Sequence, residues 1–212
     1  MGHDKDFIHM LHGSLADWQT QGGPMETEGS SPTNPIVNAK DLDTSKPTTY
    51  QATDAQNIVD KEELLELIAK QQQGKEDEDV DAIWIDARAP ERFRGEVEEP
   101  RAGMRLGHMP FAKNIFFKDL LNPENVLEFK PKEELEQILR AGGVDLSTTK
   151  RIICTCGSGA TACALVAALE LVGIPPERCY LYDASWAEWG ALPDTPIVKE
   201  EVDTAKRQKV EK

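Results

Sequence analysis

The stretch from Arg151 to Glu170 constrains the fold of this chain more than any other part of the sequence. It begins as a short apolar run suited to a buried strand, makes a Gly-rich turn at residues 156–161, and continues as an Ala/Leu/Val segment with helical spacing. This order places Cys156 beneath a helix N-terminus, where free backbone N–H groups and the helix dipole favour an anion. That anion can be the thiolate of Cys156 itself.

The turn has the residues that such a site requires. Gly157 and Gly159 let the backbone curl so that successive N–H groups point inward, and Ser158 and Thr161 add hydroxyl donors. The alternative is an inert core cysteine beside an ordinary turn, but the strand, the glycine pair and the helix together favour a reactive Cys156. The remaining three cysteines are expected to be structural: Cys154, Cys163 and Cys179. No histidine stands at zinc-ligand spacing from Cys156, so no metal is expected.

The loop Cys156-Gly-Ser-Gly-Ala-Thr161 resembles the active-site loop of the rhodanese superfamily. It is most similar to that of the 3-mercaptopyruvate sulfurtransferases, which usually carry Val where this chain has Ala160. The resemblance implies that Cys156 is the nucleophile and that Ser158 assists proton transfer. It also implies that four further loop residues bind substrate: Gly157, Gly159, Ala160 and Thr161.

A second segment carries five arginines between Arg88 and Arg105, in a strongly acidic chain. The motifs Asp-Ala-Arg, Arg-Phe-x-Gly, Glu-Pro-Arg and Gly-His-x-Pro resemble the substrate loop in the second domain of the same sulfurtransferases. In that family two arginines hold the substrate carboxylate and carbonyl, and they correspond here to Arg92 and Arg101. Three other arginines are expected in solvated ion pairs with nearby glutamates: Arg88, Arg94 and Arg105. The resemblance implies a structural role for His108.

Strand and helix patterns alternate through the second half of the chain, which predicts an α/β fold with a parallel sheet and helices on both faces. The site should lie at the carboxyl edge of the strands. The patterns predict strands near residues 56–59, 80–86, 115–117, 151–155 and 178–182, and helices at 61–73 and 132–141. Ser185 is expected to cap a short helix that carries Trp186 and Trp189. The family resemblance implies a rhodanese-like domain, preceded by a flexible N-terminal segment.

Domain boundaries follow from a repeat. Leu11-His-Gly-Ser-Leu-Ala-Asp-Trp18 aligns without gaps with Tyr182-Asp-Ala-Ser-Trp-Ala-Glu-Trp189, and in tandem sulfurtransferases each domain ends in such a segment. Residues 1–28 are therefore predicted to be a remnant of a first rhodanese-like domain and residues 29–55, rich in Ser, Thr and Pro, a linker. Residues 56–198 are the predicted catalytic domain, and 199–212 a charged, disordered tail.

The chain has 212 residues and a formal charge of −14, which argues against a general nucleic-acid or anionic-membrane surface. Its four cysteines are too few for a disulfide scaffold, so a reducing compartment is expected, cytoplasmic or mitochondrial. The expected partners are a small anionic sulfur substrate and a thiol acceptor such as thioredoxin or a small thiol. No cofactor is expected.

The resemblance implies transfer of sulfur from 3-mercaptopyruvate to a thiol through a persulfide on Cys156, with release of pyruvate. A thiosulfate-specific rhodanese carries Arg and Lys after the cysteine, and this chain has the neutral Gly157 and Ser158, which favours a monoanionic substrate. A cysteine phosphatase needs an Arg six positions after the nucleophile, where this chain has Ala162. Two alternatives remain: a thiosulfate sulfurtransferase, or a sulfur-relay module with weak turnover, because the family's proton-transfer helpers belong to a first domain.

Overall fold

The computed structural model describes residues 13–25, 57–73 and 80–199 of the chain. The chain divides into two compact units, Met1–Gln56 and Asn57–Lys212. The predicted linker at 29–55 and the predicted tail after Lys199 lie outside the described residues.

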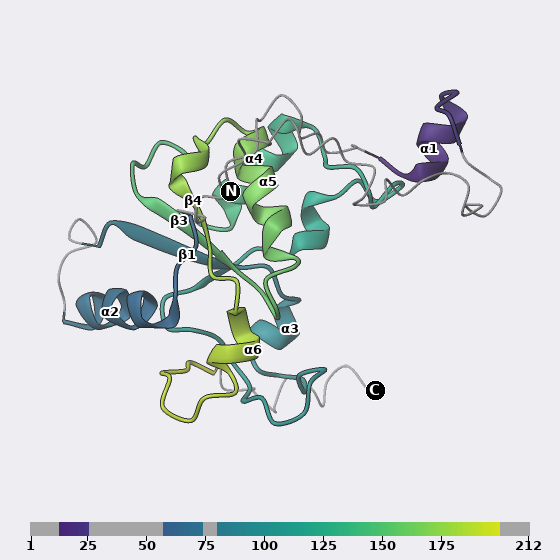
Figure 1. Ribbon diagram of the computed structural model, residues 1–212. Coiled ribbons are helices and arrows are strands. Elements are labelled where there is room, and N and C mark those ends of the chain that lie inside the picture. Colours follow the sequence, from purple (N-terminus) through teal and green to yellow (C-terminus); the bar gives the residue numbers. More distant parts are fainter. Residues whose placement is uncertain (1–12, 26–56, 74–79, 200–212) are drawn as a thin grey trace, which may run out of the picture. The chain divides into compact units, whose positions relative to one another are not determined.

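The described part of the larger unit is built around a parallel sheet of four strands in the order β2-β1-β3-β4 (Figure 1). The strands are β1 (Ala82–Asp86), β2 (Lys113–Asn114), β3 (Arg151–Thr155) and β4 (Cys179–Leu181). The α-helices are α2 (Lys61–Gln72), α3 (Pro90–Phe93), α4 (Lys132–Ala141), α5 (Ala162–Leu171) and α6 (Ser185–Trp189). Two 3-10 helices, η3 (Phe117–Leu120) and η4 (Pro176–Arg178), complete the unit.

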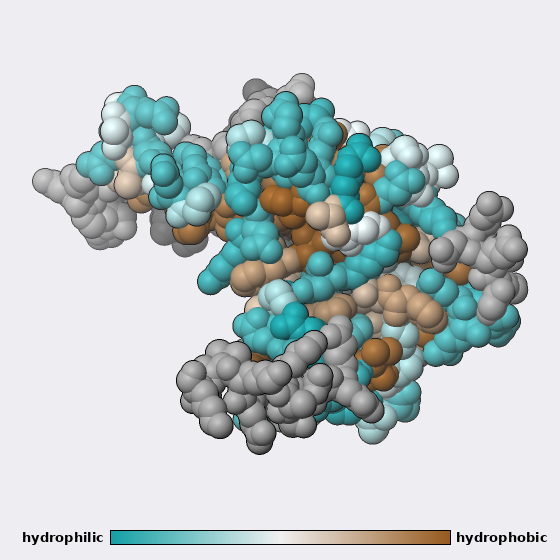
Figure 2. Space-filling view, turned by 180° about the vertical axis from the view of Figure 1, so that it is seen from behind, coloured by the Kyte–Doolittle hydropathy of each residue, from teal (hydrophilic) through white to brown (hydrophobic). Residues whose placement is uncertain are grey.

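Helices cover both faces of the sheet, which confirms the predicted layering (Figure 1). Alternate residues of β3 point to opposite faces. Ile152 and Cys154 pack with α4 and α5, whereas Ile153 packs with α2 and α6. The second cluster also contains three buried aromatic side chains of large size: Trp84, Trp186 and Trp189. On the face shown in Figure 2, hydrophilic residues cover most of the surface and hydrophobic ones gather in its central part.

Local sequence signals account for the helices α2 and α4. Asp60 is the N-cap of α2, and its side chain accepts a hydrogen bond of 2.9 Å from the Glu63 N–H, as expected of an Asp at this position. Helix α4 ends where the sequence predicts, at Ala141 before Gly142-Gly143. Gly143 has φ of +81°, the left-handed conformation that glycine adopts without a steric penalty.

Two predicted strands differ from the structure. The strand expected to begin at Ile115 lies two residues earlier, because Asn114 pairs with Asp86 at the end of β1, and the chain then turns into η3. Near residue 58 the sheet gains only an isolated bridge between Ile58 and Leu181 of β4.

The smaller unit contains one described helix, α1 (Leu15–Thr20). Ser14 and Asp17 form a capping box, and Trp18 Nε1 donates to the Pro24 carbonyl at 3.1 Å. In the aligned segment Trp189 Nε1 donates to the Pro196 carbonyl at 2.9 Å, so the two segments share a local contact as well as a sequence pattern. Helix α1 buries no residue, and its Leu15 is 63% exposed. Part of the repeat, residues 11 and 12, lies outside the described residues.

In the described part of the chain, no helix combines the length and the apolar character needed to span a membrane.

Candidate active site

The two sequence segments singled out above follow neighbouring strands. Asp86, the last residue of β1, pairs with Thr155, the last residue of β3. The arginine segment therefore begins at the same sheet edge at which Cys156 follows β3. This is the carboxyl edge of the parallel strands, where the site was predicted.

A pocket of about 220 Å³ lies between these segments. Its lining includes all but one of the predicted site residues: Arg92, Arg101, Cys156, Gly157, Ser158, Ala160 and Thr161. The exception is Gly159, whose N–H donates to Ser185 Oγ at 3.0 Å. Gly159 has φ of +83°, and a Cβ there would lie 2.5 Å from the Asp183 carbonyl oxygen, so the position requires glycine.

Cys156 is 1% exposed although it lines the pocket. The N–H of Ser158 lies 3.4 Å from Cys156 Sγ and points a positive dipole at the sulfur. The Ser158 side chain is exposed at the pocket wall. The loop thus presents one backbone donor to the sulfur, which favours negative charge there, and one hydroxyl to the pocket.

The environments of the other cysteines oppose their ionisation. Burial raises the pKa of the Cys154 thiol well above its ordinary value and that of Cys179 to about 11. Burial also raises the pKa of Cys163, an exposed residue on α5, and the nearby Cys156 and Asp183 add to the shift. Cys154 is fully buried, in agreement with its predicted core position.

Arg92 reaches the pocket from α3. Its Nη2 donates to Glu99 Oε2 at 2.5 Å, while its Nε is buried without a hydrogen-bond partner among the described residues. The Arg92 side chain as a whole is 25% exposed and lines the pocket, so its guanidinium can bind an anion there. A Cβ on Gly157 would lie 3.0 Å from Arg92 Nη2, which explains why this loop position has no side chain.

Arg101 is placed differently. Its side chain is exposed at the pocket rim, and within residues 13–25, 57–73 and 80–199 it has no hydrogen bond or ion pair. The two arginines of the predicted clamp thus share one pocket with Cys156. One is oriented by a carboxylate and the other is free to adjust to a ligand.

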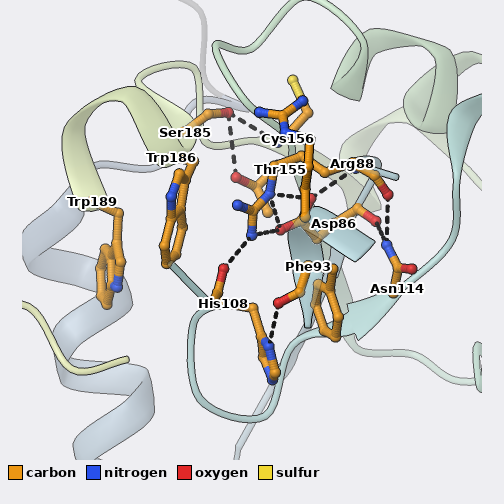
Figure 3. Close-up of polar contacts among 12 residues, drawn as sticks. Asp86, Arg88, Phe93, His108, Asn114, Thr155, Cys156, Ser185, Trp186 and Trp189 are labelled. Carbon is orange, nitrogen blue, oxygen red and sulfur yellow. Dashed lines mark hydrogen bonds and ion pairs between the residues drawn. The ribbon is translucent and has the colours of Figure 1, made fainter. Parts of the chain in front are cut away.

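Beneath the pocket lies a buried ion-pair network that the sequence did not reveal (Figure 3). Arg88 forms a predicted kind of ion pair, with Glu99 at 2.8 Å, but the expected solvation is wrong: Arg88 is 2% exposed and also pairs with Asp86 at 2.7 Å. Glu99 in turn orients Arg92. Arg88 and Arg92 thus pair with the carboxylates of Asp86 and Glu99, whereas Arg101 is exposed at the pocket rim outside these pairs. In the sequence, the sign that Glu99 belongs to this network is its place two residues before Arg101 in the motif Glu-Pro-Arg.

The other two arginines of the segment, Arg94 and Arg105, and the neighbouring His108 have structural contacts. Arg94 pairs with Glu96 at 2.8 Å near the surface, as predicted. Arg105 instead donates to backbone carbonyls, among them that of Trp189 at 2.9 Å, so the expectation of an ion pair is wrong for this residue. His108 stacks on Phe93 with ring centroids 3.8 Å apart and bonds the Phe93 carbonyl through Nδ1 at 2.8 Å, in agreement with a structural role (Figure 3).

Ser185 does not cap α6. The N-cap position is Ala184, and no side chain caps the helix. The Ser185 hydroxyl turns instead to the Cys156 loop, where it accepts the N–H of Cys156 at 3.1 Å (Figure 3). No set of three or more His, Cys, Asp or Glu side chains within the described ranges is arranged to hold a metal ion.

The sequence is similar to known sulfurtransferases. It is 34% identical over 201 residues to thiosulfate/3-mercaptopyruvate sulfurtransferase 1, mitochondrial, of Arabidopsis thaliana, covering 92% of this chain and 50% of that protein. It is 36% identical over 182 residues to human 3-mercaptopyruvate sulfurtransferase, covering 86% and 52%. The chain spans about half the length of these relatives.

Solved structures agree with the sequence comparison. The crystal structure of the Tum1 protein from Saccharomyces cerevisiae superposes with a TM-score of 0.58 at 31% identity, over 73% of this chain and 51% of that one. Residues 60–192 match the family model described as the rhodanese-like domain. This range contains the whole pocket, the ion-pair network and all four strands. The chain therefore belongs to the rhodanese-like domain family.

Proposed function

We propose that this chain is a sulfurtransferase that moves sulfur from 3-mercaptopyruvate to a thiol acceptor through a persulfide on Cys156. The observation that carries the proposal is the single pocket in which Cys156 and Ser158 face Arg92 and Arg101. A nucleophile, a hydroxyl and two carboxylate-binding groups are the parts that this reaction needs. The names of the relatives support the substrate assignment.

In the first half-reaction the Cys156 thiolate attacks the substrate sulfur. An S–S bond forms, the C–S bond breaks, and its electron pair leaves on carbon as the enolate of pyruvate. The substrate thiol proton moves to that carbon, with Ser158 at the pocket wall as the relay, so the products are pyruvate and an ionised Cys156 persulfide. In the second half-reaction a thiol acceptor takes the outer sulfur as its own persulfide, and the Cys156 thiolate is restored.

The charge of the pocket fits this substrate. Two guanidinium groups in the pocket lining, those of Arg92 and Arg101, can bind the carboxylate of 3-mercaptopyruvate. Gly157 and Ser158 are neutral, so the loop adds no cation for a dianion such as thiosulfate. The printed name of the Arabidopsis relative includes thiosulfate, so thiosulfate is the second candidate donor.

The test is an assay of pyruvate and sulfide release with a reduced thiol acceptor, using 3-mercaptopyruvate and thiosulfate side by side. We expect turnover of 3-mercaptopyruvate to exceed that of thiosulfate and to vanish in Cys156→Ser. Cys163→Ser is the matched control, since this cysteine is exposed on α5 and should be dispensable. Retained activity in Cys156→Ser would refute the proposal, and a preference for thiosulfate would favour the second candidate.

A further inference from the structure

Ser185 is a buried hydroxyl whose bonds differ from those its sequence context predicts. Ser185-Trp-Ala-Glu188 repeats the pattern of Ser14-Leu-Ala-Asp17, in which Ser14 Oγ accepts the Asp17 N–H and caps α1. Ser185 is instead fully buried, and its side chain caps nothing in α6. Its hydroxyl is therefore available for another contact.

That contact is with the loop that carries Cys156. Ser185 Oγ accepts the N–H groups of Cys156 at 3.1 Å and of Gly159 at 3.0 Å, and donates to the Tyr182 carbonyl at 2.8 Å. A hydroxyl has one proton to donate and two lone pairs to accept, so these three bonds fill its capacity, and Thr155 Oγ1 at 3.3 Å is a fourth, longer contact of the same oxygen. One side chain thus binds the backbone of the Gly-rich turn at two positions, Cys156 and Gly159.

The backbone of α6 binds the same loop. The N–H of Trp186 donates to the Cys156 carbonyl and the N–H of Ala187 to the Gly157 carbonyl, each at 3.0 Å. These bonds turn both carbonyl dipoles toward α6, and a carbonyl oxygen facing the sulfur would repel a thiolate. The Ser158 N–H is left directed at Sγ.

Ser185 adopts an unfavourable backbone conformation in this role. Its φ is +54°, and Phe111 is the other non-glycine residue with positive φ in the described ranges. A residue with a Cβ rarely adopts this conformation, and such outliers concentrate at functional sites where surrounding contacts enforce them. The hydrogen bonds of the hydroxyl to the Cys156 loop and to the Tyr182 carbonyl are among those contacts.

The next residue extends the connection to the arginine segment. Arg88 Cζ lies 4.2 Å from the ring centroid of Trp186, and Trp186 Nε1 donates to the Arg105 carbonyl at 3.0 Å. The start of α6 therefore contacts both the sulfur loop and the buried network that orients Arg92. A shift of α6 would move the sulfur relative to the clamp.

We propose that Ser185 is a positioning residue for the sulfur chemistry: its hydroxyl holds the Cys156 loop in the form that stabilises negative charge on the sulfur. The inference rests on the proposed function for its role in turnover. Its effect on the thiolate does not depend on the substrate, because the Ser158 N–H faces Sγ in the free protein.

The test measures how fast iodoacetamide alkylates Cys156 as a function of pH, with the product mapped by mass spectrometry, in wild type, Ser185→Ala and Ser185→Gly. Both variants lack the hydroxyl, whereas Ser185→Gly also relieves the backbone conformation. We expect the midpoint of the pH profile to rise by about one unit in both, which lowers the thiolate fraction about tenfold below the midpoint. Turnover number should fall in parallel, with little change in KM.

Thr195→Val is the matched control. Thr195 is also a buried hydroxyl, 3% exposed, but it donates to the Trp189 carbonyl at 2.5 Å and accepts from Arg105. Its loss should lower the melting temperature and leave the alkylation profile unchanged. An unchanged profile in both Ser185 variants, or an equal shift in Thr195→Val, would overturn the inference. A wild-type protein that fails to turn over 3-mercaptopyruvate would refute the proposed function, while the alkylation profiles would still decide the role of Ser185.

Discussion

At the scale of single residues, the two arginines of the clamp differ in what holds them. Arg92 is paired with the buried Glu99, and Arg101 is exposed at the rim. Their replacement by alanine should weaken use of 3-mercaptopyruvate far more than Arg94→Ala, whose side chain pairs with Glu96 near the surface. A charged hydrogen bond contributes roughly 1.5–3 kcal/mol, so kcat/KM should fall about tenfold or more in each clamp variant. Steady-state kinetics on the three variants checks this, and equal losses in all three would indicate a diffuse positive field instead of a clamp.

Cys179 illustrates how a buried thiol links stability to pH. Burial raises its pKa from 9.0 to about 11, so the native protein binds this proton more tightly than the unfolded chain does. The resulting stability is fully present below pH 9 and is lost as the pH rises through about 11. The free energy of unfolding, measured by urea titration across this window, should therefore fall less steeply in Cys179→Ala than in wild type. Identical slopes for wild type and Cys179→Ala would contradict the assignment.

At the scale of elements, the turn between β3 and α5 depends on Gly159. Gly159 and Gly103 share φ of +83°, but a Cβ on Gly159 would meet the Asp183 carbonyl oxygen at 2.5 Å, while nothing lies within 4 Å of one on Gly103. Gly103→Ala should cost about 1–2 kcal/mol, the left-handed penalty alone. Gly159→Ala should cost more and also displace the Cys156 loop.

The comparison needs two measurements, denaturant unfolding for stability and the rate of Cys156 alkylation for the loop. We expect Gly103→Ala to alkylate as wild type does and Gly159→Ala to alkylate more slowly. Equal stability losses with equal alkylation rates would mean that the contact with Asp183 has no effect on the site.

At the scale of the whole molecule, both hydrophobic clusters lie within the larger unit. Of the residues that the structure describes before Val59, namely 13–25, 57 and 58, none belongs to the cluster with α4 and α5 or to the cluster with α2 and α6. Deletion of residues 1–40 should therefore leave the melting temperature and persulfide formation on Cys156 nearly unchanged. Calorimetry and mass spectrometry after incubation with 3-mercaptopyruvate check this. A large drop in melting temperature on deletion would show that the N-terminal segment is integrated into the fold.

Much of the fold could be predicted from the sequence because its signals are local. The apolar run and Gly-rich turn at residues 151–161 predict β3 and the loop, and Lys132 to Ala141 shows helical spacing that matches α4 to the residue. Such patterns depend on neighbours a few positions away, which the sequence displays directly. The family resemblance, carried by contiguous motifs, pointed to the loop and to Arg92 and Arg101, which share the pocket.

Only the tertiary structure decided which contacts Ser185 makes and whether Arg88 is buried. Ser185 has the local pattern of a helix cap, yet its hydroxyl bonds Cys156, because the β4–α6 connection brings it beneath the loop. Arg88 lies among charged residues that suggest solvent, yet Asp86 and Glu99 neutralise it in the interior. A capping pattern and a charged run specify which groups can bond, but hydrogen bonds and ion pairs form between groups that the fold brings within about 3 Å, whatever their separation along the chain.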